Sequence, residues 1–128
     1  MTELHPFLAV RDVDVAIELY ARAFGAVLVG DVLRAPHGPA VAELEIDGCR
    51  FGLATEAPQL GTPSPATAGA TTVRLSLTVD DPDAVAARAV EAGCTLMFPV
   101  ADQPYGWRQG RVVDPFGHHW LVGRPLPV

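Results

Sequence analysis

The sequence predicts an α+β fold made of two βαβββ modules in tandem. An internal repeat is the first observation: Asp12 and Asp81 open matching helix entries, Gly48 and Gly117 end matching turns, and each pair is 69 residues apart. The second observation is the order of elements, because a strand, a helix and three strands can be read in each half. One offset that holds early and late in the chain indicates a structural unit built twice.

The first half contains one helix and four strands. Asp12 supplies an N-cap, apolar residues follow at helical spacing and Gly25 supplies a C-cap, which together predict an amphipathic helix over residues 13–24. Asp47-Gly48 is a dipeptide favoured by tight primed turns and predicts a β-hairpin. The predicted strands of this half, including both arms of the hairpin, cover residues 6–10, 26–32, 41–46 and 49–54.

The second half repeats this order. Asp81 followed by Pro82 predicts a helix start, and Gly93 predicts its end near residue 92. The predicted strands cover residues 73–79, 95–100, 109–113 and 118–122.

Length and composition predict a single domain. The chain has 128 residues, of which 49% are hydrophobic and 19% are charged, as expected of a soluble globular protein with one core. Within this domain, 1–128, residues 4–56 form the first module and 73–124 the second. Residues 57–72 are rich in Pro, Gly, Thr and Ala, and we interpret them as a linker without an element.

Composition also excludes classes of partner. No apolar run approaches the ~20 residues that a membrane-spanning helix needs, and no signal peptide precedes the first strand, so we expect a cytoplasmic protein. The net charge is −6, and the nine basic residues, all arginine, form no run, which argues against nucleic acid. A chain rich in Ala, Val, Gly and Pro that uses only arginine indicates a GC-rich bacterial genome.

Two segments give the chain a family resemblance. The helix entry over residues 10–20 and the ending Tyr-Gly-Trp-Arg (105–108) with Asp-Pro-Phe-Gly-His-His-Trp (114–120), placed in paired βαβββ halves, resemble the vicinal oxygen chelate superfamily. Glyoxalase I, bleomycin-resistance proteins, fosfomycin-resistance enzymes and extradiol dioxygenases belong to it. The resemblance implies an open, cup-shaped mixed sheet with helices outside and a ligand on the concave face. It also implies a homodimer in which the partner chain completes the cup, often with halves exchanged.

Alternation along the strands then separates the two faces of each sheet, because the face under a helix must be apolar. The positions predicted to face the helices are Leu8, Val10, Leu44, Ile46, Phe51, Leu53, Leu75, Leu77, Val79, Trp120 and Val122. The positions predicted to face the cup are His5, Phe7, Glu43, Glu45, Arg50, Gly52, Arg74, Ser76, Thr78, His119 and Leu121.

The resemblance also implies where metal-dependent relatives hold a divalent ion with His, Glu or Gln. The corresponding positions here are His5, Gly52, Arg74 and Leu121. Only His5 can bind a metal, since an arginine keeps its proton and a catalytic ion needs about three protein ligands. We therefore predict that the usual metal site is lost and that no cofactor is bound. The alternative is a divalent metal held by His5 together with Glu43, Glu45 or His119.

Charge and aromatic residues predict what the cup holds instead. An arginine in a partly dry cup needs a partner, so Arg74 and Arg50 should meet Glu43 or Glu45, or an anionic group of a ligand. Aromatic side chains such as Trp107, in a Gly-rich loop, can stack on a flat ligand. The predicted ligand-binding residues are His5, Phe7, Glu43, Glu45, Arg50, Arg74, Ser76, Tyr105, Trp107 and His119.

Two functions of different class remain. The first is a binding protein that sequesters a small flat or anionic molecule, a drug or a metabolite, as bleomycin-type antibiotic-resistance proteins do. The second is an enzyme, either a metal-dependent lyase or isomerase of the glyoxalase type or a metal-free acid–base catalyst that uses His5 with Glu43 or Glu45. The missing metal ligands favour binding. No catalytic residue is assigned, and the ligand stays unidentified because a fold does not fix a substrate.

Overall fold

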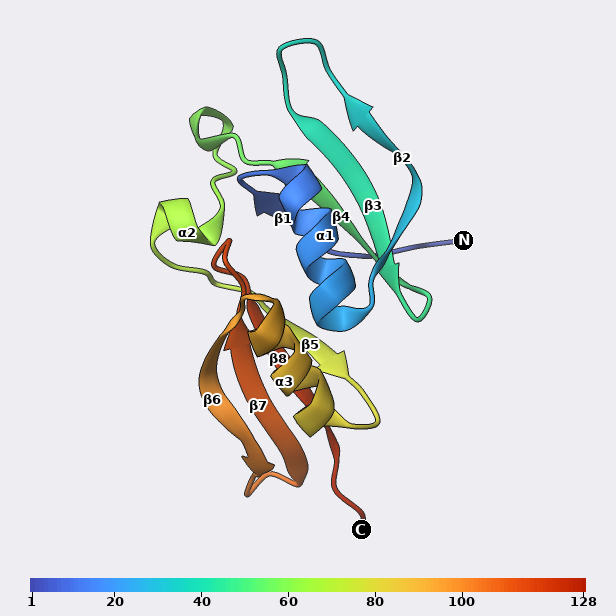
Figure 1. The fold of residues 1–128 in the computed structure, drawn as a ribbon, viewed down its shortest axis with the longest axis vertical. Helices are drawn as coiled ribbons and strands as arrows, with labels where there is room; N and C mark the ends of the chain where they lie inside the picture. The colour runs from blue at the N-terminus through green and yellow to red at the C-terminus, as the bar shows by residue number, and fades with distance from the viewer.

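A computed structural model describes residues 1–128 and contains two βαβββ modules joined by a short helical segment (Figure 1). The first module consists of β1 (Phe7–Val10), α1 (Val13–Phe24), β2 (Val27–Arg34), β3 (Ala40–Ile46) and β4 (Cys49–Thr55). The second consists of β5 (Arg74–Thr78), α3 (Pro82–Ala92), β6 (Thr95–Asp102), β7 (Trp107–Val113) and β8 (His119–Pro125). The predicted α+β fold class is confirmed.

Each module forms one four-stranded mixed sheet. The strand orders are β1-β4-β3-β2 and β5-β8-β7-β6, and only the pairs β1–β4 and β5–β8 are parallel. Phe7 pairs with Gly52 and Ser76 with Leu121, so the offset of 69 residues holds in the register itself. In Figure 1 both α1 and α3 lie in front of their sheets, so the other face of each sheet is left without a helix.

The predicted capping residues fix both helices. The side chain of Asp12 accepts a hydrogen bond from the backbone N–H of Val15 at 3.1 Å, and Gly25 ends α1 with a φ of 71°. Asp81 accepts from the N–H of Ala84 in the same way at the start of α3. The predicted bounds of the two helices are therefore confirmed.

The segment between the modules differs from the prediction. The sequence predicts no element over residues 57–72, whereas the structure contains a 3₁₀ turn, η1 (Pro58–Leu60), and a single-turn helix, α2 (Pro65–Ala68). Ser64 caps α2 by accepting a hydrogen bond from the N–H of Thr67, and proline at the next position already has a helical φ. Local capping chemistry thus folds a segment whose composition resembles a linker.

One hydrophobic core runs through both modules. Its centre is an aromatic cluster in which the Trp120 ring of the second module lies 4.5 Å from the ring centroid of Phe24 and 5.5 Å from that of Tyr20. Most positions predicted to face the helices are buried: Leu8, Val10, Leu44, Ile46, Phe51, Leu53, Trp120 and Val122. Leu75, Leu77 and Val79 are only half-buried, although they pack against this core.

A buried carboxyl group ties the modules together. Asp114, only 3% exposed, accepts hydrogen bonds from Tyr20 Oη at 2.6 Å and from Trp120 Nε1 at 2.9 Å. Its other oxygen accepts from the backbone N–H groups of Phe116 and His118. Burial, with the Asp114 carboxyl group alongside, raises the pKa of Tyr20 well above its ordinary value. None of the helices is long and apolar enough to cross a membrane.

Candidate functional site

The helix-free faces of the two sheets carry separate hollows, which we call the first and second half-cups. The first half-cup, of about 420 Å³, lies on β1 to β4 and is lined by His5, Phe7, Asp31, Glu43, Gly52 and apolar neighbours. The second, of about 540 Å³, lies on β5 to β8 and is lined by Arg74, Phe98, Gln103, Tyr105, Gln109, Arg111, Leu121 and small neighbours. A groove of about 1040 Å³ runs between β1 and β5, and His5, Phe7, Arg74 and Ser76 line it.

The first half-cup is acidic. Asp31 and Glu43 line it, and the only group of opposite charge nearby on β4 is Arg50. Arg50 Nη1 lies 3.3 Å from Glu43 Oε1, and Arg50 Nε lies 3.9 Å from Glu45 Oε2. Half of the Arg50 side chain is exposed to solvent, so these pairs contribute little to stability.

The second half-cup is basic. Its lining contains Arg74 and Arg111 and no acidic residue. Arg111 Cζ lies 5.3 Å from the ring centroid of Phe98, a cation–π arrangement that orients the guanidinium group. Arg111 Nε is buried and has no hydrogen-bond partner, although burying an unpaired donor is unfavourable. This half-cup therefore presents positive charge that no carboxylate of its lining neutralises.

Polar side chains on the rim of the second half-cup are already paired with one another. Tyr105 Oη donates to Gln109 Oε1 at 2.7 Å, and Gln103 Nε2 donates to the backbone oxygen of Gln109 at 2.9 Å. These bonds leave the two arginines as the unpaired groups of this half-cup.

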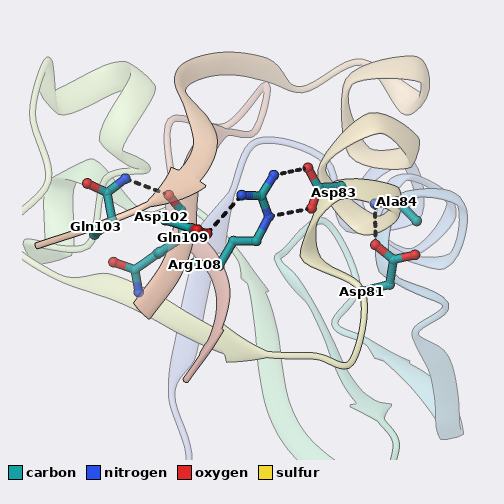
Figure 2. A network of polar contacts seen from close by, with 7 residues as sticks. All are labelled: Asp81, Asp83, Ala84, Asp102, Gln103, Arg108 and Gln109. Atoms are coloured by element: carbon teal, nitrogen blue, oxygen red, sulfur yellow. Dashed lines mark hydrogen bonds and ion pairs between the residues drawn. The ribbon is translucent and has the colours of Figure 1, made fainter. Parts of the chain in front are cut away.

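A third arginine of β7, Arg108, has a different role. Its side chain points toward α3 and lies between two carboxylates (Figure 2). The guanidinium group makes a bidentate contact with Asp83 at 2.7 and 2.8 Å and reaches Asp102 at 3.0 Å. The hydrogen bonds from Arg108 lower the pKa of Asp83 and raise that of Arg108 itself. Arg108 is thus a fully paired structural residue.

The four positions implied for a metal do not fit a divalent ion. His5 and Gly52 line the first half-cup, whereas Arg74 and Leu121 line the second. At Gly52, a Cβ atom would collide with the ring of Phe7, which lies directly over this glycine. No three His, Cys, Asp or Glu side chains come together to form a ligand set. Since a divalent ion needs about three imidazole, carboxylate or thiolate ligands, these four positions do not supply a metal site.

The predicted ligand-binding residues divide among these hollows. His5, Phe7 and Glu43 line the first half-cup, Arg74 and Tyr105 the second, and Ser76 the groove. Four predicted residues line none of the three: Glu45, Arg50, Trp107 and His119. Trp107, predicted to lie in a loop, is instead the first residue of β7.

The sequence prediction misses several residues of the second half-cup, among them Phe98, Gln103, Gln109 and Arg111. A signal for Arg111 exists, because its neighbour Val112 is buried, and alternation then places Arg111 on the concave face. Phe98 lies between two register shifts of β6, so alternation does not find it.

Comparison with known proteins agrees with this geometry. The sequence model of the Glyoxalase/Bleomycin resistance protein/Dioxygenase superfamily matches residues 4–122. An uncharacterized protein of Mycobacterium bovis is 42% identical over 127 residues, which cover 96% of this chain and 83% of that protein. A solved gene product of Arabidopsis thaliana is 30% identical, with a TM-score of 0.72 and coverage of 94% of this chain and 97% of the other.

A further solved structure, TnmS3, an antibiotic binding protein from Streptomyces sp. CB03234, has a TM-score of 0.71 at 24% identity and covers 98% of this chain and 97% of its own. At that identity the similarity shows a shared fold. With the family match extending over nearly the whole chain and both modules seen in the structure, this protein belongs to the glyoxalase, bleomycin resistance protein and dioxygenase superfamily.

Proposed function

We propose that this protein binds a small flat or anionic molecule, a drug or a metabolite, and sequesters it without a metal ion. The observation that carries the proposal is the second half-cup, where two unpaired arginines lie beside the aromatic rings of Phe98 and Tyr105. A concave site with aromatic walls and a few polar groups is typical of small-molecule sites. TnmS3 supports the proposal to the extent that an antibiotic-binding protein uses the same fold.

We propose in addition that the binding site is completed in a cytoplasmic homodimer. The two half-cups of one chain lie on different sheets, and the groove between β1 and β5 touches only the edge of each: none of these three hollows contains residues of both β3 and β7. Apolar side chains on β2 and β6 are also left exposed, such as Leu33 at 68% and Phe98 at 53%.

The dimer is tested by static light scattering at micromolar concentration. We expect a mass of twice the 13.5 kDa of one chain. A mass of one chain would refute the shared cup and leave two independent half-cups.

Metal independence is tested by elemental analysis after incubation with Ni, Zn, Mn or Fe(II) and desalting. We expect no retained ion, because the positions that could hold one supply a single imidazole. About one ion per chain, lost in His5→Ala, would contradict the proposal and favour a metal-dependent lyase or isomerase.

A second candidate function rests on His5 and Glu43, which line the same half-cup. An imidazole and a carboxylate facing one ligand could move a proton, so a metal-free acid–base enzyme is the alternative. Product formation from a bound ligand that stops in both His5→Ala and Glu43→Gln, while binding is retained, would establish this alternative in place of sequestration.

A further inference from the structure

Arg111 differs from every other arginine with a described contact in this protein. Arg34, Arg50 and Arg108 pair with carboxylates, and Arg11 and Arg88 donate to backbone oxygens. The guanidinium group of Arg111 instead lies over the Phe98 ring, and its Nε is buried without a hydrogen-bond partner. A guanidinium group stacked on a ring keeps its in-plane N–H groups free to donate.

The backbone around Arg111 brings this stacked pair together. Phe98 pairs with Arg111 in the register of β6 and β7, between two register shifts. Gly110 allows the close approach of the strands, because a Cβ atom there would lie 2.8 Å from the backbone oxygen of Phe98 and from the backbone nitrogen of Val100. The arrangement of Phe98 and Arg111 is thus built into the sheet.

Arg74 supplies a second positive charge to the same hollow. It lies on β5, makes no hydrogen bond or ion pair, and lines the second half-cup together with Arg111. No carboxylate of this chain lines the half-cup, so both charges are left for a group from outside. An anionic group with at least two oxygens, such as a carboxylate, phosphate or sulfonate, is the natural partner of a guanidinium fork, since it accepts two parallel hydrogen bonds.

We infer that Arg111 and Arg74 form an anion subsite that selects aromatic acids: the acidic group binds the arginines, and the attached ring lies against Phe98 and Tyr105. The inference rests on the proposed binding function and specifies its ligand class. Arg111 is the principal residue, because the Phe98 ring holds its guanidinium group in place beside the hollow that it lines. Arg74 strengthens the attraction from the rim.

Two fluorescent probes that share one ring system test this inference. 1-Anilinonaphthalene-8-sulfonate is an aromatic acid, and N-phenyl-1-naphthylamine has the same rings without the sulfonate. We expect the wild-type protein to bind the sulfonate more tightly than the amine. Arg111→Gln should weaken sulfonate binding about tenfold or more and leave amine binding nearly unchanged. Arg74→Gln should cause a smaller loss in the same direction, and the matched control Arg22→Gln, which removes an exposed charge from α1, should cause none.

The outcomes separate the inference from the function on which it rests. If both probes bind equally well, or Arg111→Gln weakens both by the same factor, the anion subsite is wrong and the binding function stands. If neither probe binds, the binding function fails as well. The melting temperature of each variant checks its folding. If Arg111→Gln does not fold, Arg74→Gln and Arg111→Lys replace it in the test. The lysine keeps the positive charge but cannot make the two parallel hydrogen bonds of a guanidinium group. Sulfonate binding that is unchanged in these two variants overturns the inference.

Discussion

The buried carboxyl group of Asp114 and the buried Nε of Arg111, both in the second module, differ in whether they have hydrogen-bond partners. The carboxyl group of Asp114 accepts four hydrogen bonds on the helix side of the sheet. The Nε of Arg111, on the concave side, has none. A satisfied buried group specifies the fold, whereas an unsatisfied one reduces stability unless another molecule supplies its partner. The first group therefore accounts for stability, and the second is the basis of our proposal that Arg111 serves binding.

The largest expected effect is that of Asp114→Asn on stability. The amide keeps the shape of the side chain but places an NH₂ group against donors, either the two backbone N–H groups or Tyr20 and Trp120. We expect the free energy of unfolding to fall by about 3 kcal/mol. Urea unfolding followed by tryptophan fluorescence measures it. A change below about 0.5 kcal/mol would contradict the stabilising role given to Asp114, because its hydrogen-bond network would then not specify the fold.

A smaller effect of the same kind is expected for Tyr20→Phe, which removes one of the four hydrogen bonds. The free energy of unfolding should fall by about 2 kcal/mol, since a hydrogen bond to a charged group is lost. The matched control is Tyr105→Phe, whose hydroxyl group bonds Gln109 at an exposed position.

Tyr20→Phe should also change how stability depends on pH at high pH. Burial holds the pKa of Tyr20 well above 10.0, so the unfolded chain loses the phenolic proton first as pH rises. Above the unfolded pKa the unfolded state binds fewer protons, and stability must fall with increasing pH. Between about pH 10 and 12 the wild type should lose stability more steeply than Tyr20→Phe. Parallel curves for the two proteins would contradict a buried neutral Tyr20.

Arg111→Gln should differ from Asp114→Asn in having little effect on the free energy of unfolding while it weakens binding of the anionic probe. The variant loses the stacking on Phe98 and also removes an unsatisfied donor, and these terms oppose one another. We expect a change within about 1 kcal/mol, measured by urea unfolding. A much larger loss of stability would make Arg111 a structural residue like Asp114 and would remove the contrast between the two sides of the sheet.

The smallest effect is expected for Asp83→Asn, which tests the paired arginine, Arg108. The hydrogen-bonded ion pair with Arg108 holds the pKa of Asp83 below 3.8. The stability that this pair contributes is therefore present above the pKa of the unfolded chain and is lost as pH falls through the pKa of the folded protein. The acid-side decline in stability, between about pH 4 and 2, should be shallower in Asp83→Asn than in wild type. Asp80→Asn, at an exposed neighbouring position, should retain the wild-type slope.

The sequence predicts the elements of this fold well where local chemistry decides them. Asp12 and Gly25 bound α1 as predicted, and the Asp47-Gly48 turn joins β3 to β4 with both residues at positive φ. Burial on the helix side follows from alternation in the central strands. The segment over 57–72 is less predictable, because α2 is a single turn that depends on the cap at Ser64, while η1 has no side-chain cap at all.

The candidate site is less predictable than the fold. Phe98 and Arg111 meet only because two register shifts and Gly110 bring β6 against β7, and a register shift leaves no periodic signal. The opposite charges of the half-cups depend on which residues pair across the strands. Glu43 lies opposite Gly52 in the first module, whereas Arg111 lies opposite Leu121 in the second. Equivalent strands therefore share a core-facing pattern while their concave faces differ in charge.

The most direct test of the central claim is a two-dimensional ¹H–¹⁵N NMR titration of the labelled protein with 1-anilinonaphthalene-8-sulfonate, including the arginine Nε–Hε signals. We expect the largest shift at Arg111 Nε–Hε, with further shifts at backbone amides of β5, β7 and β8 around the second half-cup. An unshifted Arg111 signal, with changes confined to the first half-cup or to the helices, would contradict the assignment of ligand binding to the second half-cup.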